Sequence, residues 1–563
     1  METLYKKFCK EKFDKDGTLN DFEIVCPENF NFAYDVVDNL GENYPDKIAL
    51  KWCNVLGEEK VLTFKEIMEL SSRTANFFIS EGIKKGDKVM LMLKRHYEYW
   101  YVLLALHKIG AVAIPATHML TYKDIVYRVE SADVKAIVCT SEEDIHNYIL
   151  AVKDKCKSLE KIYNVRTEID GFIRLDKEIE KYSTKLKRIE NSSEDPFLMY
   201  FTSGTTGYPK GVIHNYSYPL AHIITAVYWQ NVQNNGLHLT VADTGWAKAS
   251  WGKIYGQWLA GSAVMVYDYD KFVPSDLLKV IEKYKITTFC APPTIYRFLV
   301  KENLEEYNLT SLKYATSAGE AVNPEILNSF KNNTGLTIME GFGQTESTLI
   351  IGNLKGQKNK LGSIGCPTPL YDIKLIDEDG NESDYGEIVV VPKVDKKQYG
   401  IFCNYNKDDE LYKKVWENGV YHTKDIARRD SDGYFWYEGR KDDIIKSSGY
   451  RIGPFEVENV LMQHKSVLEC AVTGVPDAIR GMVVKATIVL GKKYLPTPEL
   501  AKELQEFVKK NTAPYKYPRV VEFVSELPKT ISGKTKRMDI KNNLHKPILH
   551  VWCKKARIKW VLI

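Results

Sequence analysis

The sequence lacks several patterns that would assign it to a specialised class of protein. No two of its 10 cysteines lie at CxxC spacing, which argues against a zinc cluster or a redox pair. Its longest apolar stretch, residues 99–106, is cut by His107 and Lys108 and is too short to span a membrane. Neither an internal repeat nor a low-complexity tract is present.

The sequence also lacks a strong charge of either sign. It has 78 Lys plus Arg against 74 Asp plus Glu, a net charge of +4. This bias is too weak to predict a nucleic-acid or membrane-surface partner. The first 17 residues contain acids and no apolar core, so they resemble neither a secretory signal nor a transit peptide. Because the cysteines are scattered through apolar runs, we expect buried free thiols and a cytoplasmic location.

What is present is the composition of a large globular protein, with 563 residues, 44% of them hydrophobic and 27% charged. Up to about residue 440, short β-branched runs alternate with amphipathic stretches. Strands are expected at 86–93, 110–116 and 132–139, and a helix at 275–284. This alternation predicts βαβ units, largely parallel sheets and an α/β fold class. We assign residues 1–441 to this domain.

The pattern changes after residue 440. A helix is expected at 454–463, a strand at 483–490, and a second helix that begins at Thr497, followed by proline at the first helical position. These elements predict a compact α+β domain over residues 442–545. The remaining residues, 546–563, are basic and apolar together and receive no role.

The most informative segment is residues 200–214, YFTSGTTGYPKGVIH. Glycines allow backbone N–H groups to converge on an anion, Ser and Thr add donors, and Lys adds charge, a combination that suits a polyphosphate. The loop is not a Walker A motif, because GxxxxGK[ST] is absent. The candidate nucleotide-binding residues of this loop are Thr202, Ser203, Gly204, Thr205, Thr206, Gly207 and Lys210.

This segment resembles the signature loop of the adenylate-forming superfamily, which contains acyl- and aryl-CoA synthetases, luciferase-like enzymes and the adenylation domains of peptide synthetases. Motifs at 340–346, 421–427, 439–451 and 528–534 extend the resemblance over roughly residues 32–540. It is closest to the medium-chain and branched-chain acyl-CoA synthetases. The resemblance implies a large domain of αβ-layered sheets with a β-barrel-like subdomain, and a small mobile α+β C-terminal domain.

The motif EGFGQTE carries implied roles in holding ATP. Phe342 is expected against the adenine, Thr345 at the α-phosphate, and Glu346, with Thr206, at Mg²⁺, a hard cation that prefers oxygen ligands. The same motif, and the segment SAGE that resembles an adenine-side motif, add further nucleotide-binding positions. These are Gly319, Glu320, Glu340, Gly341, Gly343 and Gln344.

Two more motifs imply contacts with the nucleotide and a hinge. Asp425 matches the carboxylate that binds both ribose hydroxyls, although Lys424 stands where the family has glycine. Arg440 matches an arginine that reaches the nucleotide, and Arg451 one that lies near the phosphates. Asp442 matches the hinge between the two domains.

Lys534 matches the catalytic lysine of the family. The string Gly533–Thr535 imitates the end of a Walker A loop, but Pro528 stands at the position of its required glycine. The resemblance implies a two-step reaction. A carboxylic acid and ATP give an acyl adenylate and pyrophosphate, and coenzyme A then takes the acyl group and releases AMP. Because the acid and the α-phosphate are both anionic, a positioned cation should dominate the first step.

Other positions imply sites for coenzyme A and the acid. Candidates for coenzyme A are Ser448, Gly449, Tyr450, Arg480, Tyr517 and Arg519. Candidates for the acyl pocket are Trp246, Lys248, Trp251 and Gly343. Acetyl-CoA synthetases carry tryptophan where this chain has Gly343, so we expect an acid larger than acetate. If a tryptophan ring blocks the far end, a medium-chain, branched short-chain or aryl acid is favoured over a long fatty acid.

Three alternatives remain open at this point. They are an amino-acid adenylation domain, a luciferase-like oxygenase, and a non-catalytic nucleotide-binding protein. The last would not need Lys534, Glu346 and Arg440 together, and all three are present. We expect ATP, Mg²⁺, coenzyme A and a small carboxylic acid as ligands of a monomer or homodimer without a nucleic-acid partner or a membrane span.

Overall fold

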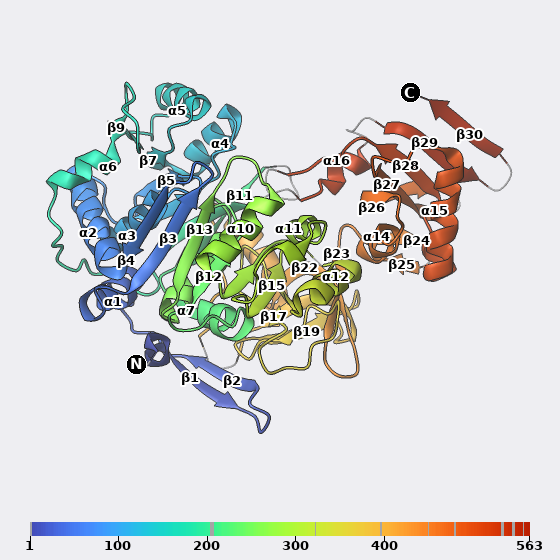
Figure 1. Cartoon of the computed structure of the whole chain (residues 1–563), viewed down its shortest axis with the longest axis horizontal. Helices are drawn as coiled ribbons and strands as arrows, with labels where there is room; N and C mark the ends of the chain where they lie inside the picture. The colour runs from blue at the N-terminus through green and yellow to red at the C-terminus, as the bar shows by residue number, and fades with distance from the viewer. Residues whose placement is uncertain are drawn as a thin grey trace.

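The computed structural model describes residues 3–202, 208–320, 322–393, 397–448, 450–477, 480–530, 534–542, 547–554 and 557–562. Figure 1 shows a large lobe, coloured blue to light orange, and a separate small lobe in dark orange and red. The predicted α/β fold with a small α+β domain is confirmed. Within the described residues, none of the helices is both long and apolar enough to cross a membrane.

The first large sheet has eight strands in the order β21-β11-β10-β6-β5-β7-β8-β9. The predicted strands appear as β5 (Lys88–Met92), β6 (Val112–Pro115) and β7 (Val134–Cys139), which pair in parallel. Next to them, β10 (Pro196–Thr202) and β11 (Lys210–Asn215) form an antiparallel pair that presents the signature loop between their ends. The outer strands are β8 (Lys161–Asn164), β9 (Ile173–Arg174) and β21 (Asn404–Tyr405).

The second large sheet has nine strands in the order β18-β17-β16-β15-β14-β12-β13-β3-β4. The six strands from β3 to β16 in this order pair in parallel, and the edge strands pair antiparallel. The strands are β3 (Ile48–Asn54), β4 (Glu59–Thr63), β12 (Leu237–Thr240), β13 (Ala263–Asp268), β14 (Thr288–Cys290), β15 (Tyr314–Ala318), β16 (Ile338–Phe342), β17 (Ile351–Gly352) and β18 (Cys366–Pro367).

Helices cover these sheets. The apolar stretch 99–106 lies in α3 (Glu98–Ile109), in which every residue is buried, so it is a core helix. The predicted helix 275–284 is α10 (Pro274–Tyr284). The other helices of the large lobe are α1 (Asn39–Asn43), α2 (Phe64–Ser80), α4 (Tyr122–Ala132), α5 (Glu143–Lys155), α6 (Leu175–Glu178), α7 (Tyr218–Ile223), α8 (Lys248–Gly252), α9 (Tyr255–Leu259), α11 (Pro293–Leu299), α12 (Pro324–Thr334) and α13 (Asp409–Val415). A hairpin of β1 (Cys9–Phe13) and β2 (Leu19–Ile24) projects from the N-terminal end (Figure 1).

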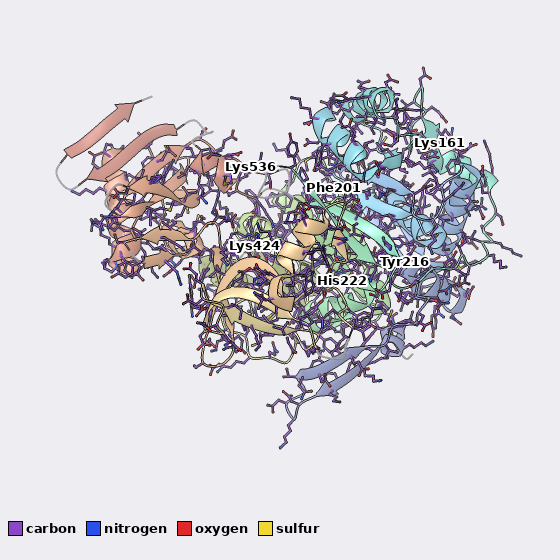
Figure 2. The ribbon with its side chains drawn as sticks, turned by 180° about the vertical axis from the view of Figure 1, so that it is seen from behind. Lys161, Phe201, Tyr216, His222, Lys424 and Lys536 are labelled. Carbon is purple, nitrogen blue, oxygen red and sulfur yellow. The ribbon has the colours of Figure 1, made fainter. Side chains whose placement is uncertain are left out.

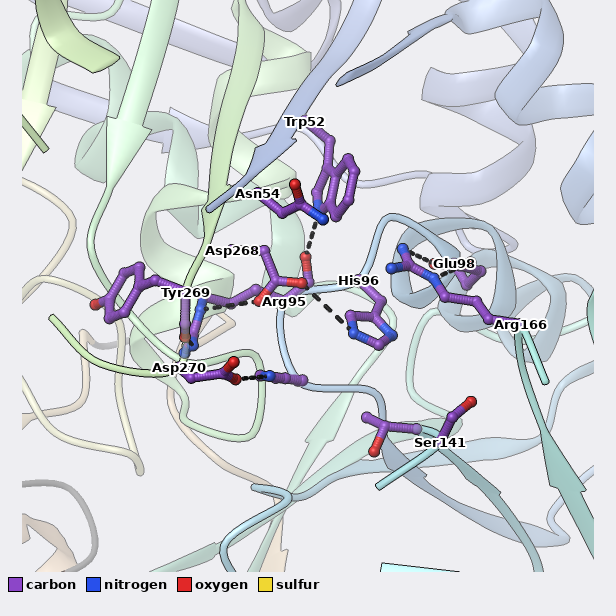
Figure 3. A network of polar contacts seen from close by, with 12 residues as sticks. Trp52, Asn54, Arg95, His96, Glu98, Ser141, Arg166, Asp268, Tyr269 and Asp270 are labelled. Atoms are coloured by element: carbon purple, nitrogen blue, oxygen red, sulfur yellow. Dashed lines mark hydrogen bonds and ion pairs between the residues drawn. The ribbon is translucent and has the colours of Figure 1, made fainter. Parts of the chain in front are cut away.

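A polar network joins the two large sheets (Figure 3). Arg95 and His96, in the turn after β5, lie 3.6 and 3.5 Å from the carboxylate of Asp268 at the end of β13. Arg95 also lies 3.3 Å from Asp243, the first residue of the segment that contains the predicted acyl-pocket side chains. Because these groups are buried, their pairing fixes how the sheets meet and where that segment starts.

A smaller antiparallel sheet follows, in the order β19-β20-β22-β23, and it corresponds to the predicted barrel-like subdomain. Its strands are β19 (Asp372–Ile376), β20 (Tyr385–Val391), β22 (Tyr421–Arg429) and β23 (Phe435–Arg440). The register places Asp425 of β22 opposite Arg440 of β23. The sheet therefore brings two of the predicted nucleotide residues together.

The small lobe contains its own sheet and core. The predicted helices appear as α14 (Pro454–Met462) and α15 (Pro498–Asn511), and Thr497 caps α15 by accepting a hydrogen bond from the Leu500 N–H at 3.2 Å. The other elements are β24 (Ile445–Ser447), β25 (Tyr450–Ile452), β26 (Val467–Asp477), β27 (Gly481–Leu490), β28 (Val520–Val524), α16 (Arg537–Lys541), β29 (Pro547–Lys554) and β30 (Arg557–Leu562). The last two strands extend the sheet beyond β28, and the role of this tail remains unassigned.

Candidate active site

Predicted site residues from three sheets meet on the side of the large lobe that faces the small lobe. Lys210 comes from β11, Glu346 follows β16, and Asp425 lies on β22. Figure 2 places Phe201 and Lys424 of the large lobe, and Lys536 of the small lobe, along the sides of the lobes that face each other.

The buried carboxylate of Asp425 is the centre of one cluster. It accepts hydrogen bonds from Gln344 Nε2 at 2.5 Å, Tyr437 OH at 2.9 Å and Arg440 Nη1 at 3.2 Å. Burial raises the pKa of Asp425, and the Arg440 charge and the hydrogen bonds oppose this rise. These three hydrogen bonds fix the orientation of the Asp425 carboxylate before a ligand binds, so that it can accept hydrogen bonds from ligand hydroxyl groups.

Lys424 adopts the backbone conformation for which the family glycine is suited. Its φ is +60°, in the left-handed region that a side chain disfavours. Glu387 holds the strained peptide, because its Oε1 accepts the Lys424 N–H at 2.9 Å while its Oε2 pairs with Lys441 at 2.8 Å. The replacement of glycine therefore leaves the local geometry in place.

The first residue of the motif EGFGQTE is part of the core, whereas later residues of the motif lie at the candidate site. Glu340 is buried and accepts a hydrogen bond from the Val322 N–H at 2.9 Å, and burial raises its pKa to about 8. Phe342 is half-buried, with its ring centre 6.1 Å from that of Tyr437. His214 Nε2 lies 2.9 Å from the carbonyl oxygen of Thr345, which fixes the backbone at the predicted α-phosphate contact.

Lys210 and Glu346 form a second charged pair of the candidate site, separate from the Asp425 cluster. Residues 203–207, which include five predicted nucleotide contacts, lie outside the described residues. Thr202 pairs with Lys210 at the base of the loop. The Lys210 ammonium lies 4.0 Å from Glu346 Oε1, and burial lowers the pKa of Lys210.

Gly319 and Glu320, two further predicted nucleotide-binding residues, follow β15 and are exposed.

Lys534 belongs to the small lobe, and its positive charge affects the pKa of two groups in the large lobe. Burial lowers the pKa of Lys248, and the charge of Lys534 lowers it further. The same charge acts on Asp425, where it counteracts the effect of burial. The Lys534 ammonium is therefore within electrostatic range of both the predicted acyl pocket and the ribose cluster. Its side chain is exposed, and its backbone N–H donates to Thr530 Oγ1 at 3.1 Å.

Of the predicted acyl-pocket residues, Trp251 lies directly beside Gly343. A Cβ atom at Gly343 would lie 2.5 Å from Cη2 of Trp251, so the indole ring occupies the space beside this glycine. Lys248 Nζ donates to the carbonyl oxygen of Ala318 at 2.8 Å, and Trp246 is half-buried. The ring of Trp251 thus occupies the space into which a side chain at 343 would project.

The predicted hinge and phosphate residues lie at the boundary between the lobes. Asp442 is exposed, with Oδ1 3.8 Å from Arg440 Nε, and its carbonyl accepts a hydrogen bond from Lys541 at 3.0 Å. Arg451 does not join the Asp425 cluster in this arrangement. It pairs with Glu378 of the large lobe at 2.5 Å, and its predicted contact with phosphate stays a prediction.

The predicted coenzyme A residues form two groups on the small lobe, and Gly449 lies outside the described residues. In the first group, Arg480 Nη1 donates to Ser448 Oγ at 3.2 Å, and Tyr450 stacks on Tyr515 with ring centres 4.0 Å apart. In the second, the Arg519 guanidinium lies 4.6 Å from the centre of the Tyr517 ring. Neither group is brought to the Asp425 cluster by a described contact.

Sequence reasoning missed three tyrosines of the site. Tyr437 binds Asp425, Tyr421 donates to Gln344 Oε1 at 2.6 Å, and Tyr405 donates to Glu346 Oε1 at 2.9 Å. Tyr421 stands at the start of a quoted motif, Tyr437 lies two residues before another, and Tyr405 is far from every motif. Only the pairing of distant strands reveals their contacts.

The strain at Lys424 generates the first prediction. Lys424→Gly should raise the free energy of unfolding by roughly 0.5–1 kcal/mol, because the relief of the left-handed penalty exceeds the entropy that glycine gains in the unfolded chain. Urea unfolding measures the change. Lys60→Gly, in the extended strand β4, is the control and should lower stability. A Lys424→Gly protein less stable than the parent would contradict the prediction.

Comparison with known proteins agrees with this geometry. The family described as AMP-binding enzyme matches residues 37–391, and the AMP-binding enzyme C-terminal domain matches residues 456–534. The human acyl-coenzyme A synthetase ACSM3, mitochondrial, is 41% identical over 550 residues, which cover 95% of this chain and 93% of that protein. The Mus musculus acyl-coenzyme A synthetase ACSM4, mitochondrial, is 40% identical over 540 residues and 92% of each chain.

Among solved structures, the anthranilate CoA ligase AuaEII in complex with anthranoyl-AMP has a TM-score of 0.84 and 27% identity, and the match covers 92% of this chain and 98% of that one. A Brucella canis acyl-CoA synthetase has a TM-score of 0.68 and 29% identity, with 92% and 94% covered. Because each of these two matches covers 92% of this chain, each includes both the large and the small lobe. The chain therefore belongs to the AMP-binding enzyme family, on its acyl-CoA synthetase branch.

Proposed function

We propose that this protein is an AMP-forming acyl-CoA synthetase. It joins a carboxylic acid to ATP as an acyl adenylate with loss of pyrophosphate, and then transfers the acyl group to coenzyme A with release of AMP. The observation that carries the proposal is the family match over both lobes together with the buried Asp425 carboxylate, which Gln344, Tyr437 and Arg440 hold by hydrogen bonds.

The first step joins two anions. The acid carboxylate attacks the α-phosphorus, and the bond to pyrophosphate breaks, so catalysis depends on positioning and on cations near the phosphoryl oxygens. We assign to Lys534 the link between acid and α-phosphate. Asp425 receives the ribose hydroxyls, with Gln344, Tyr437 and Arg440 holding its carboxylate.

The residues present suit Mg²⁺ bound with ATP. Glu346 is 9% exposed and offers carboxylate oxygens, the ligand type that this hard cation prefers. Thr206, the second predicted metal residue, lies outside the described residues. Glu346 and Thr206 would hold the cation, which would supply positive charge to the phosphate oxygens.

The second step requires Lys534 to leave. Several described contacts between the lobes are polar and near the surface, such as Arg451 with Glu378 at 2.5 Å and Arg297 with Glu469 at 3.8 Å. Contacts of this type are weak individually, which favours a rotation about Asp442. Rotation would bring the Ser448 to Tyr450 loop and Arg480 to the site, where coenzyme A enters.

The acid is proposed to be a medium-chain, branched short-chain or aryl acid, because Gly343 replaces the tryptophan of acetyl-CoA synthetases and the Trp251 ring, which fills the space beside Gly343, would limit the length of the pocket. A panel of C2–C10, branched and aryl acids, scored by CoA-thioester formation, tests the proposal. Pyrophosphate release driven only by amino acids would favour the amino-acid rival, and light emission the luciferase-like one. A protein that binds ATP without forming AMP would be a non-catalytic binder.

We also propose a cytoplasmic location and a monomer or homodimer. The location rests on the cysteines, which are free among the described residues and mostly buried, as expected in a reducing compartment. The relatives ACSM3 and ACSM4 are named as mitochondrial. Microscopy of a C-terminal fluorescent fusion tests the location, and light scattering of the purified protein tests the oligomeric state.

Lys534→Ala is predicted to slow adenylate formation by about 10²–10³-fold, the loss typical of one group aimed at developing charge. Thioester formation from pre-made acyl adenylate should remain near the parental rate. Lys536→Ala is the control, because it removes a lysine two residues away that pairs with Asp539 at 3.7 Å. Adenylate formation at the parental rate in Lys534→Ala would refute the role.

Glu378→Gln is predicted to slow adenylate formation about 2- to 5-fold without slowing the thioester step. The change removes two exposed ion pairs across the lobes, with Lys446 at 2.8 Å and Arg451 at 2.5 Å, each typically contributing about 0.2–1 kcal/mol. Glu382→Gln is the matched control, because Glu382 pairs with Lys374 and Arg429 inside the large lobe. Equal effects of both variants on both steps would argue against a role between the lobes.

Trp251→Ala is predicted to shift the preference toward longer acids, with a gain of up to about 5- to 10-fold in relative kcat/KM for each methylene that enters the new space. Trp251→Phe should give a smaller shift and preserves more packing if the alanine variant is unstable. Competition between pairs of straight-chain acids measures the change. An unchanged order of preference in both variants would mean that Trp251 does not limit the pocket.

A further inference from the structure

We propose that Tyr405 is a positioning residue that keeps Lys210 and Glu346 apart, so that both charges are available when ATP and its cation arrive. This inference rests on the proposed function and adds a residue to which no motif assigns a role. Tyr405 lies on the edge strand β21, is buried, and stands between the two charged side chains.

The first contact is with the carboxylate. The Tyr405 hydroxyl donates to Glu346 Oε1 at 2.9 Å, within the ordinary range of an O–H···O hydrogen bond. Glu346 is itself 9% exposed, so the bond forms in a site from which water is largely excluded. The hydroxyl therefore holds the orientation of the carboxylate before any ligand is present.

The second contact is with the ammonium. Lys210 Nζ lies 4.6 Å from the centre of the Tyr405 ring, within the range of a cation–π interaction. The same nitrogen lies 4.0 Å from Glu346 Oε1, longer than a hydrogen-bonded ion pair of about 2.8 Å. One side chain thus offers a hydroxyl to the negative group and a ring face to the positive group.

Backbone contacts explain why this tyrosine reaches both groups. Tyr405 is paired in register with Val212 of β11, and the Asn406 N–H donates to the carbonyl oxygen of Gly211 at 2.7 Å, beside Lys210. On the other side, the Phe402 N–H donates to the carbonyl oxygen of Glu346 at 2.8 Å. The segment from 402 to 406 is therefore tied to the strand that carries Lys210 and to the turn that carries Glu346.

The consequence of losing the hydroxyl follows from electrostatics. A lysine and a glutamate in a partly buried site attract each other strongly, and without the competing hydroxyl they should close into a direct ion pair. ATP needs the ammonium and its cation needs the carboxylate, so that ion pair would have to break before binding. Tyr405 reduces this cost by holding the charges apart in the ligand-free protein.

The test compares Tyr405→Phe with the parent. Phenylalanine keeps the ring and its packing, so thermal unfolding should be nearly unchanged. Calorimetric titration with a non-hydrolysable ATP analogue at several Mg²⁺ concentrations should show about 10-fold weaker binding at low Mg²⁺, and a difference that narrows as Mg²⁺ rises. In steady-state assays the KM for ATP should rise more than kcat falls. Tyr371→Phe is the matched control, because it removes another buried hydroxyl, bonded to Thr348 at 2.7 Å.

A double-mutant cycle separates positioning from general packing. In Glu346→Gln the side chain no longer attracts Lys210 as an anion, so adding Tyr405→Phe should cause little further loss of binding. Parental binding by Tyr405→Phe, or losses that simply add in the double variant, would overturn the inference. Failure of the parent itself to bind the analogue would instead overturn the proposed function.

Discussion

The need to bring two anions together while keeping cations available is the constraint on which the site depends. A carboxylate and a triphosphate repel each other, and every cation that approaches them can be captured by a protein carboxylate instead. Here Arg440 is committed to Asp425 at 3.2 Å, whereas Lys210 is held 4.0 Å from Glu346. Lys534 is exposed on the small lobe, and we propose that it enters the site for the first step and leaves for the second.

The architecture separates what must be rigid from what must move. Buried polar pairs, such as those of Arg95 and His96 with Asp268, join the two large sheets, and α3 is buried along its full length. Breaking such contacts is costly, so the nucleotide site keeps its shape. The contacts of Glu378 with the small lobe are exposed ion pairs, which contribute little individually and can exchange. This difference in contacts is consistent with our proposal that a preformed site is combined with a mobile lysine.

Much of the site could be predicted from sequence because its residues lie in short contiguous motifs. Alternation of apolar runs located β5, β6 and β7, and helix caps located α15, since these signals are local. Tyr405 and Tyr437 could not be found in this way. Tyr437 contacts Asp425 on the neighbouring strand, and Tyr405 contacts Glu346 in a turn 59 positions away, and such contacts depend on how strands pair and pack rather than on neighbouring residues.

The sequence by itself determined the class of fold and the family, and it predicted the phosphate loop and the lysine that we propose for the first step, because local composition and motif spacing carry these signals. Tertiary structure alone decided that Trp251 occupies the space beside Gly343, that Arg451 pairs with Glu378, and that one tyrosine touches both Lys210 and Glu346. The physical reason is that each of these contacts joins segments far apart in the chain, and the packing of three sheets and two lobes sets the distances between them.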